Sequence, residues 1–224
     1  MVLSELFIFD TVVNFIIIIA SFLLFRKTRE IYKLSLQKGV KYLSYAMLFY
    51  VFSFSIRYIE LIFSNFFPEH GTLIIVLIFI NLFCAAMGGF YLGYCLMWRR
   101  FETSRRKPHY KTAVFFGLIA LFISLFEIYM ITIYGITQAY LFFSVMILYI
   151  LIAIGLNCRH CKLSMGPELN PFLSIVGLGL GVYIAFFIEN LLIGILPTIH
   201  YYAWAVAAVF TLTFLFYVYK IIEW

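Results

Sequence analysis

Seven long apolar stretches alternate with short polar segments along this chain of 224 residues. The stretches lie near 6–25, 42–64, 72–98, 113–135, 138–157, 171–196 and 202–222. Each is long enough to cross the hydrocarbon core of a bilayer, which takes about 20 apolar residues in a helix. We expect helices rather than strands, because lipid offers no hydrogen-bond partners and the alternating segments of about 10 residues found in membrane barrels are absent. The pattern predicts an all-α, polytopic membrane protein in which residues 1–224 form one seven-transmembrane-helix bundle.

The composition also indicates a membrane location. Hydrophobic residues make up 65% of the chain and charged residues 12%, and the mean hydropathy is +1.06. A soluble domain of this length could not bury so much apolar surface. We therefore expect a multi-pass protein of the plasma membrane with the lipid bilayer as its main partner. Acidic Glu5 and Asp10 precede the first stretch's apolar core and Arg26 follows it, the reverse of a secretory signal, so this stretch should remain as an anchor.

The basic residues predict how the chain is oriented. Fifteen of the sixteen Lys and Arg residues lie between the apolar stretches or at their ends: Arg26, Lys27, Arg29, Lys33, Lys38, Lys41, Arg99, Arg100, Arg105, Arg106, Lys107, Lys111, Arg159, Lys162 and Lys220. The segments 65–71, 135–137 and 197–202 contain none. By the positive-inside rule the basic segments are cytoplasmic, which places the N-terminus outside and the C-terminus in the cytoplasm.

This distribution argues against nucleic acid as a partner, despite a net charge of +6. The basic segments would instead contact anionic lipids of the cytoplasmic leaflet. A cytoplasmic protein partner or a homo-oligomer is a further expectation.

Small and polar residues recur at helical spacing within four of the stretches. These stripes are Asp10, Asn14 and Ser21; Ala46, Tyr50, Ser53, Arg57, Glu60 and Ser64; Gly117, Ala120, Ser124 and Glu127; and Gly177, Gly181, Ala185 and Glu189. Small residues let membrane helices approach closely, so each stripe should face protein rather than lipid. For the small residues taken alone, ordinary packing seams are the simpler explanation.

Five ionisable residues lie inside the stretches: Asp10, Arg57, Glu60, Glu127 and Glu189. Counting residues from the cytoplasmic ends at about 1.5 Å per residue places them all about 24–28 Å from the cytoplasmic edge. A charge at the bilayer centre costs about 2.5–3.5 kcal/mol, and less near an interface. Arg57 can pair with one or two carboxylates, and Glu60 lies one turn away from it. Two or three acids remain in surplus.

An acid surplus inside a membrane requires protonated carboxyl groups or a bound cation. We therefore predict an outward-facing pocket, made by the five ionisable residues and Asn190, that binds a proton, a metal ion or a small cationic ligand. The alternative is an arginine–carboxylate network that only fixes helix packing. Asp10 is the residue that we expect to reach outward to water most readily.

No cofactor is expected, although a bound cation is. Retinal would need a lysine in the interior of the last stretch, and Lys220 lies at its end. Cys158 and Cys161 form a Cys-x-x-Cys pair and are weak candidates for metal ligands, because structural zinc needs four ligands and no second pair exists. Cys84 and Cys95 lie within the third stretch, so no structural disulfide is expected.

The opening of the chain consists of the first stretch, a basic segment from Phe25-Arg26-Lys27 to Lys41-Tyr42-Leu43, and the second stretch. It resembles the opening of the seven-helix sensor domains of prokaryotic histidine kinases. The resemblance covers about a quarter of the chain and carries over no site residue. It implies a membrane sensor. Those sensors also carry a cytoplasmic output domain, which we do not expect in this chain, so signalling would require a partner.

The leading functional hypothesis is recognition of a cation or small cationic ligand by a sensor- or receptor-like module. The alternatives are a small-molecule or proton-coupled transporter and a structural subunit of a membrane complex. An enzyme is less favoured, because no nucleophile accompanies the carboxyl groups. Transport requires a polar path to the cytoplasm, and few polar residues lie below the charged level: Asn81, Ser124, Thr211 and Thr213. This scarcity favours binding over conduction.

Overall fold

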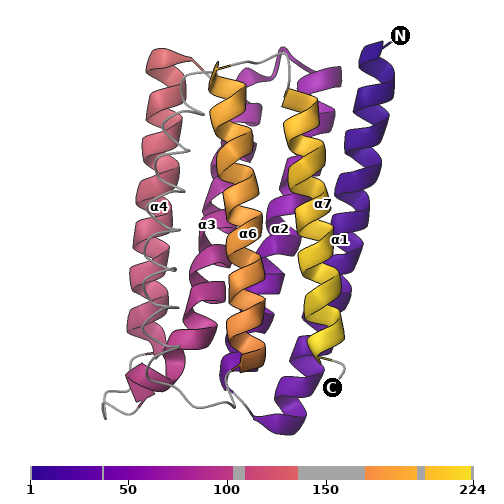
Figure 1. Ribbon diagram of the computed structural model, residues 1–224. Coiled ribbons are helices and arrows are strands. Elements are labelled where there is room, and N and C mark those ends of the chain that lie inside the picture. The colour runs from indigo at the N-terminus through magenta and orange to yellow at the C-terminus, as the bar shows by residue number, and fades with distance from the viewer. Residues whose placement is uncertain (1, 37, 103–108, 136–169, 196–199, 223–224) are drawn as a thin grey trace.

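Six long helices make up the computed structural model, which describes residues 2–36, 38–102, 109–135, 170–195 and 200–222. They are α1 (Val2–Ser35), α2 (Lys38–Phe66), α3 (Gly71–Glu102), α4 (His109–Tyr134), α6 (Asn170–Ile195) and α7 (His200–Ile222) (Figure 1). These ranges contain no strand, and all six helices are long and apolar enough to cross a membrane. The all-helical prediction is therefore confirmed for them. The stretch 138–157, the count of seven that depends on it, Cys158 and Cys161 lie outside the described residues.

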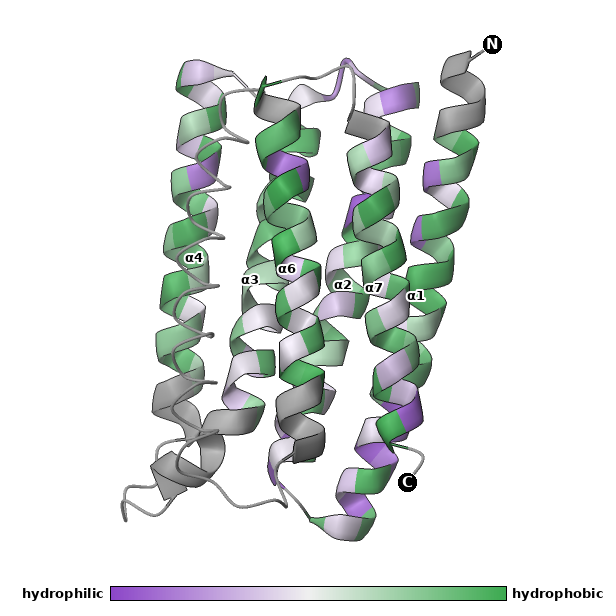
Figure 2. Ribbon diagram, viewed as in Figure 1, coloured by the Kyte–Doolittle hydropathy of each residue, from purple (hydrophilic) through white to green (hydrophobic). Residues whose placement is uncertain are grey.

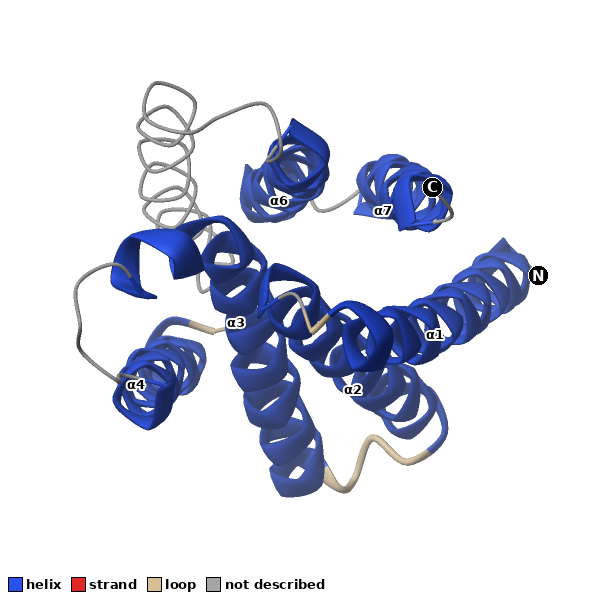
Figure 3. Ribbon diagram, turned by 90° about the horizontal axis from the view of Figure 1, so that it is seen from below, coloured by secondary structure: helices blue, strands red, loops and turns tan. Residues whose placement is uncertain are grey.

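The helices form two layers. α1, α2, α3 and α4 lie side by side in chain order, while α6 packs against α3 and α7 packs against both α6 and α1 (Figure 3). The start of α1 and the end of α7 lie at opposite ends of the bundle (Figure 1). The junction between α1 and α2, with its basic residues, lies at the same end as the end of α7.

α1 continues as one helix through the basic segment that follows its apolar stretch. No Gly or Pro interrupts it, and Arg26 and Glu30, one turn apart, form an exposed ion pair at 3.9 Å. The ammonium group of Lys27 lies 3.8 Å above the ring of Tyr219, which joins α1 to α7. The helix ends where Leu36 adopts a left-handed backbone conformation with φ of 54°.

The outward faces of the helices are apolar. Large exposed side chains include Phe15 and Phe22 on α1, Leu118 and Phe122 on α4, and Phe210 and Phe216 on α7. Figure 2 shows green, hydrophobic residues along most of each helix, with purple residues gathered at the junction of α1 and α2. An apolar outer surface over the length of the helices suits contact with a lipid bilayer.

The inward faces carry most of the predicted stripes. Asn14, Ser21, Ala120 and Ser124 are fully buried, as their spacing predicted. The stripe on α6 is buried at Ala185 and Glu189 but not at Gly177, which is exposed and where an added Cβ would meet nothing within 4 Å. The close approach to α3 is made instead at a neighbouring glycine of α6, Gly179, where an added Cβ would collide with the Leu92 side chain.

Candidate functional site

One cavity of about 260 Å³ is lined by residues of all six described helices. We call it the acidic cavity, because four of these helices contribute a carboxyl group to its wall. Its lining includes all six residues proposed for the ligand pocket: Asp10 on α1, Arg57 and Glu60 on α2, Glu127 on α4, and Glu189 and Asn190 on α6. Four acidic groups therefore share a single cavity with one basic group.

The acidic cavity is elongated along the bundle. On α2 its lining runs from Tyr50 to Ser64, fourteen residues further on, which corresponds to about 21 Å of helix. Ser64 is exposed and lies close to the loop between α2 and α3. The charged residues lie toward this outer end, and neutral side chains line the inner end.

Arg57 connects the two layers of the bundle. Its Nη2 atom lies 3.7 Å from Oε1 of Glu189 on α6. Its guanidinium group also lies over the ring of Trp204 on α7, with 3.9 Å between Cζ and the ring centroid. A cation stacked on a buried indole gains about 2 kcal/mol or more. The sequence identified Arg57 as a partner for carboxylates, and the structure adds the aromatic contact.

Trp204 is the site residue that sequence reasoning missed. An aromatic residue near a helix end is usually part of the interfacial belt, yet Trp204 is only 1% exposed. Its indole Nε1 has no hydrogen-bond partner among the described residues. The available signal was the spacing of Trp204, Ala207, Ala208 and Thr211, which places one large and three small residues on one face of α7, and all four are buried.

Asp10 is buried, which contradicts the expectation that it would reach outward. It is 6% exposed, and the Asn14 side chain donates hydrogen bonds to its Oδ1 atom at 3.0 Å and to its backbone oxygen at 2.9 Å. Asn14 is one turn further along α1, so both side chains lie on the face that packs against α2 and α7. The polar partner on the same helix makes the inward orientation possible.

Glu127 differs from the other acids of the cavity. It is 3% exposed, and its Oε2 atom has no hydrogen-bond partner among the described residues. None of the ion pairs found in the described part of the chain includes it. Glu189 is equally buried and also has an unpartnered Oε2, but its other oxygen faces Arg57. The charge of an ionised Glu127 would therefore have no counter-ion in the described structure.

The remaining two predicted residues lie beside these groups. Glu60 is half-buried one turn beyond Arg57, and it is near enough to both Arg57 and Asp10 to interact with their charges. Asn190 donates a hydrogen bond to the backbone oxygen of Phe186 at 2.7 Å. Its amide is thus bound to its own helix while it contributes to the cavity wall.

Neutral polar side chains line the inner end of the acidic cavity. The hydroxyl groups of Tyr50 and Tyr183 lie 3.2 Å apart, and Tyr183 donates a hydrogen bond to the backbone oxygen of Ala85 at 3.0 Å. Ser53 donates to Oδ1 of Asn81 at 2.6 Å. These contacts join α2, α3 and α6 across the bundle.

Two adjacent glycines of α3 make room for the tyrosine pair. A Cβ at Gly89 would collide with the Tyr183 hydroxyl group, and a Cβ at Gly88 would come within 2.8 Å of the Tyr50 ring. The phenol rings can therefore lie directly against the backbone of α3. Gly88 and Gly89 could not be identified as important from the sequence, because their role depends on the tyrosines that face them from other helices.

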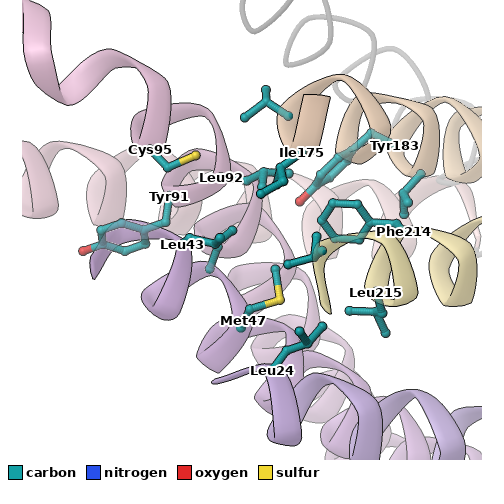
Figure 4. Close-up of a cluster of buried hydrophobic side chains, with 14 of the residues drawn as sticks. Leu24, Leu43, Met47, Tyr91, Leu92, Cys95, Ile175, Tyr183, Phe214 and Leu215 are labelled. Carbon is teal, nitrogen blue, oxygen red and sulfur yellow. The ribbon is translucent and has the colours of Figure 1, made fainter. Parts of the chain in front are cut away.

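A layer of almost fully buried apolar side chains lies between the acidic cavity and the basic end of the bundle. This apolar plug consists of Leu24, Leu43, Met47, Leu92 and Ile175, from α1, α2, α3 and α6 (Figure 4). Each lies nearer the basic end of its helix than the cavity-lining residues Ser21, Tyr50, Ala86 and Val182. The plug separates the cavity from the basic end within the described structure.

The carboxyl groups do not converge on a metal site. In the described ranges, no group of three or more His, Cys, Asp or Glu residues is arranged so that it could hold a metal ion. Cys84 and Cys95 are buried free thiols within α3.

Comparison with protein-family models, with curated proteins and with solved structures finds no match for this chain. The functional argument therefore depends on the geometry of the acidic cavity.

Proposed function

We propose that this protein is an integral membrane receptor-like module that binds a small cation or cationic ligand in the acidic cavity. The observation that carries the proposal is the charge imbalance of the cavity wall, with four carboxyl groups and one guanidinium group. Buried charges are expensive unless they are paired, so a bound cation would stabilise the site. The unpartnered oxygens of Glu127 and Glu189 are available to accept its hydrogen bonds.

The proposed orientation places the acidic cavity on the outer side of the membrane. The basic segment between α1 and α2 and Lys220 at the end of α7 lie at the end of the bundle beyond the apolar plug. The positive-inside rule makes that end cytoplasmic. The cavity then opens toward the outer loops, near the exposed Ser64 and the exposed Glu69–His70 pair.

The apolar plug favours recognition over transport. A carrier must expose its site to both sides in turn, and it usually does so with broken helices or polar residues near the bilayer midplane. The five side chains of the plug are all apolar. Two buried hydroxyl groups of α1 and α2, those of Thr28 and Ser44, lie at or beyond its level, and that of Thr28 is bound to the backbone of its own helix. A receptor without a path through the membrane would instead pass its signal to a partner, and the basic cytoplasmic segments are the proposed place of contact with that partner and with anionic lipids.

Transport remains the second candidate because of one observation. The tyrosine pair and the Ser53–Asn81 hydrogen bond carry polar groups deeper than the charged residues. A proton or small ligand could advance to this level if the plug opened. Uptake of an identified ligand into proteoliposomes would support the carrier, and binding without uptake would support the receptor.

The proposal is tested by the thermal stability of the purified protein in detergent, screened against Na⁺, K⁺, Mg²⁺, Ca²⁺ and simple amines. We expect at least one cation to raise the unfolding midpoint by several degrees at a concentration about 100-fold above its Kd. Glu127→Gln and Glu189→Gln should reduce that effect.

Glu69→Gln is the matched control, because Glu69 is exposed and lies outside the cavity lining. It should leave the response to cations unchanged. If no cation stabilises the wild-type protein while both cavity variants lose stability, the charged residues serve packing and the proposal is wrong.

A further inference from the structure

We infer that the ligand of the acidic cavity is a small organic amine with an apolar body, and that Glu127 is its counter-ion. The inference rests on the proposed function and narrows it to one chemical class. It follows from three features: the spacing of the acids, the unbalanced charge at Glu127, and the apolar wall beside it.

The spacing of the acids disfavours a metal ion. A divalent metal needs several ligand atoms within about 2.0–2.6 Å of one point. No group of three potential ligands meets this need in the part of the chain that the structure describes. The carboxyl groups come from four helices around an elongated space, so they suit an extended ligand better than a point charge.

The distribution of partners selects Glu127. Glu189 faces Arg57 at 3.7 Å, and Asp10 accepts a hydrogen bond from Asn14 at 3.0 Å. Glu127 has neither an ion pair with a described residue nor a partner for its Oε2 atom, although it is almost completely buried. An ammonium group placed beside it would supply both a charge and hydrogen-bond donors.

The wall near Glu127 is apolar and partly aromatic. Ile123 and Ile131 flank Glu127 one turn away on α4, and Phe186 lines the cavity from α6. Val182 and Phe214 continue the apolar lining toward the inner end of the cavity. Such a wall stabilises hydrocarbon but offers nothing to the hydration shell of an inorganic ion. Aromatic faces also attract organic ammonium groups, as the stacking of Arg57 on Trp204 already illustrates in this site.

The volume limits the size of the ligand. At about 260 Å³ the cavity is close to the lower end of ligand pockets, which begin at about 300 Å³. A single ring or a short branched chain bearing one amine matches this space. A lipid or a peptide does not.

Benzylamine and its neutral isostere benzyl alcohol test the inference with purified, full-length protein. Benzylamine should raise the unfolding midpoint of the wild type at concentrations where benzyl alcohol and NaCl of equal ionic strength do not. Glu127→Gln should weaken the apparent affinity for benzylamine by about tenfold or more, because a charge-assisted hydrogen bond is lost. Glu69→Gln should leave it unchanged.

A second variant tests the apolar wall without altering charge. Val182→Phe should reduce the space for the ring, so it should weaken the effect of benzylamine while Glu127 stays intact. This variant and the comparison of the two wild-type ligands remain decisive even where Glu127→Gln does not fold.

The outcomes separate the two proposals. If inorganic cations stabilise the wild type through Glu127 or Glu189 but benzylamine does not, the inference is overturned and the proposed function stands. Equal stabilisation by benzylamine and benzyl alcohol also overturns the inference, because the charge would then be irrelevant. If neither cations nor amines act, both fail together.

Discussion

Arg57 has partners on two other helices at once, an acid on α6 and an indole on α7. Each partner is almost fully buried. Removing one member of such a group leaves the others desolvated without compensation, which costs more than the pair gains when it forms. The arginine therefore belongs to the packing of the bundle as well as to the charge of the acidic cavity.

Arg57→Met should destabilise the protein by about 3–5 kcal/mol, because it leaves Glu189 as a buried, unpaired carboxyl group. The double variant Arg57→Met/Glu189→Gln should recover a large part of this loss, since it removes the uncompensated charge. Thermal unfolding of the two single variants and the double variant in detergent measures the coupling.

Arg26→Met provides the matched control for this cycle. Arg26 forms an exposed ion pair with Glu30 at 3.9 Å, so the same substitution should cost no more than about 1 kcal/mol. If the stability loss of the double variant equalled the sum of the losses of Arg57→Met and Glu189→Gln, the two residues would not be coupled.

The charged residues of the site could be predicted from the sequence, whereas Trp204 could not. Asp10, Arg57, Glu127 and Glu189 stand out because charge is costly in lipid, whatever the helix arrangement. A tryptophan near a helix end is equally suited to the interface and to the core. Only the rotation of α7, which depends on its neighbours, decides between them.

At the scale of helices, the inner end of the acidic cavity depends on contact between phenol rings and bare backbone. The Tyr183 side chain of α6 occupies the space that a side chain at Gly89 of α3 would fill. Its hydroxyl group donates a hydrogen bond to the Ala85 backbone oxygen of α3 and lies 3.2 Å from the Tyr50 hydroxyl group of α2. Three helices are thus held in one relative position by two tyrosines and two glycines.

Gly89→Ala should destabilise the protein by about 1–3 kcal/mol, because the added methyl group collides with the Tyr183 hydroxyl group and a rigid ring must move. The hydrogen bond from Tyr183 to Ala85 should weaken as a result. Thermal unfolding measures the loss. Tyr183→Phe removes the nearest colliding atom but leaves the ring carbon Cζ 2.8 Å from the added methyl group, so partial recovery in the double variant identifies the origin of the loss.

Gly177→Ala is the control, since a Cβ there meets nothing within 4 Å. Alanine is the better helix former by about 1 kcal/mol, so this variant should be as stable as the wild type or more stable. If Gly177→Ala lost as much stability as Gly89→Ala, the loss at Gly89 could not be attributed to the collision with Tyr183.

The helices themselves were predictable, but their contact faces were only partly so. The buried stripe of Ala120 and Ser124 followed from spacing, whereas the stripe predicted on α6 holds at Ala185 and Glu189 but not at Gly177. Gly177 and Gly179 are two residues apart and equally small. Residue type alone cannot distinguish them, because the choice depends on where Leu92 of α3 lies.

At the scale of the whole molecule, the described bundle is asymmetric along its axis. Polar and charged side chains surround a cavity toward one end, and the apolar plug separates that cavity from the basic end. The sequence already indicated part of this asymmetry, because it places the basic segments at one end of the helices and the buried acids nearer the other end. The plug could not be derived from the sequence, because its residues are ordinary apolar ones scattered over four helices.

The proposed orientation predicts which ends of the helices face the outside of the cell. In a background with the four native cysteines replaced by alanine, a membrane-impermeant thiol reagent should label Ser64→Cys in intact cells. Ser35→Cys, at the end of α1, should be labelled only after the membrane is permeabilised. Both positions are exposed, so accessibility to solvent does not favour either one.

The unsubstituted cysteine-free protein controls for labelling of other groups. Labelling of Ser35→Cys in intact cells, with Ser64→Cys protected, would reverse the orientation and place the acidic cavity on the cytoplasmic side.

The position of the apolar plug has a consequence for the response of the protein to voltage. Water and ions in the acidic cavity would be continuous with one side of the membrane, so much of the transmembrane potential would fall across the plug and part of it across the cavity. Moving one charge through the full potential changes the free energy by about 2.3 kcal/mol per 100 mV. A cation bound beside Glu127 would cross a fraction of that potential. With the cavity open to the outside, a cell interior at negative potential would draw the cation inward, and its affinity would fall when the membrane depolarises.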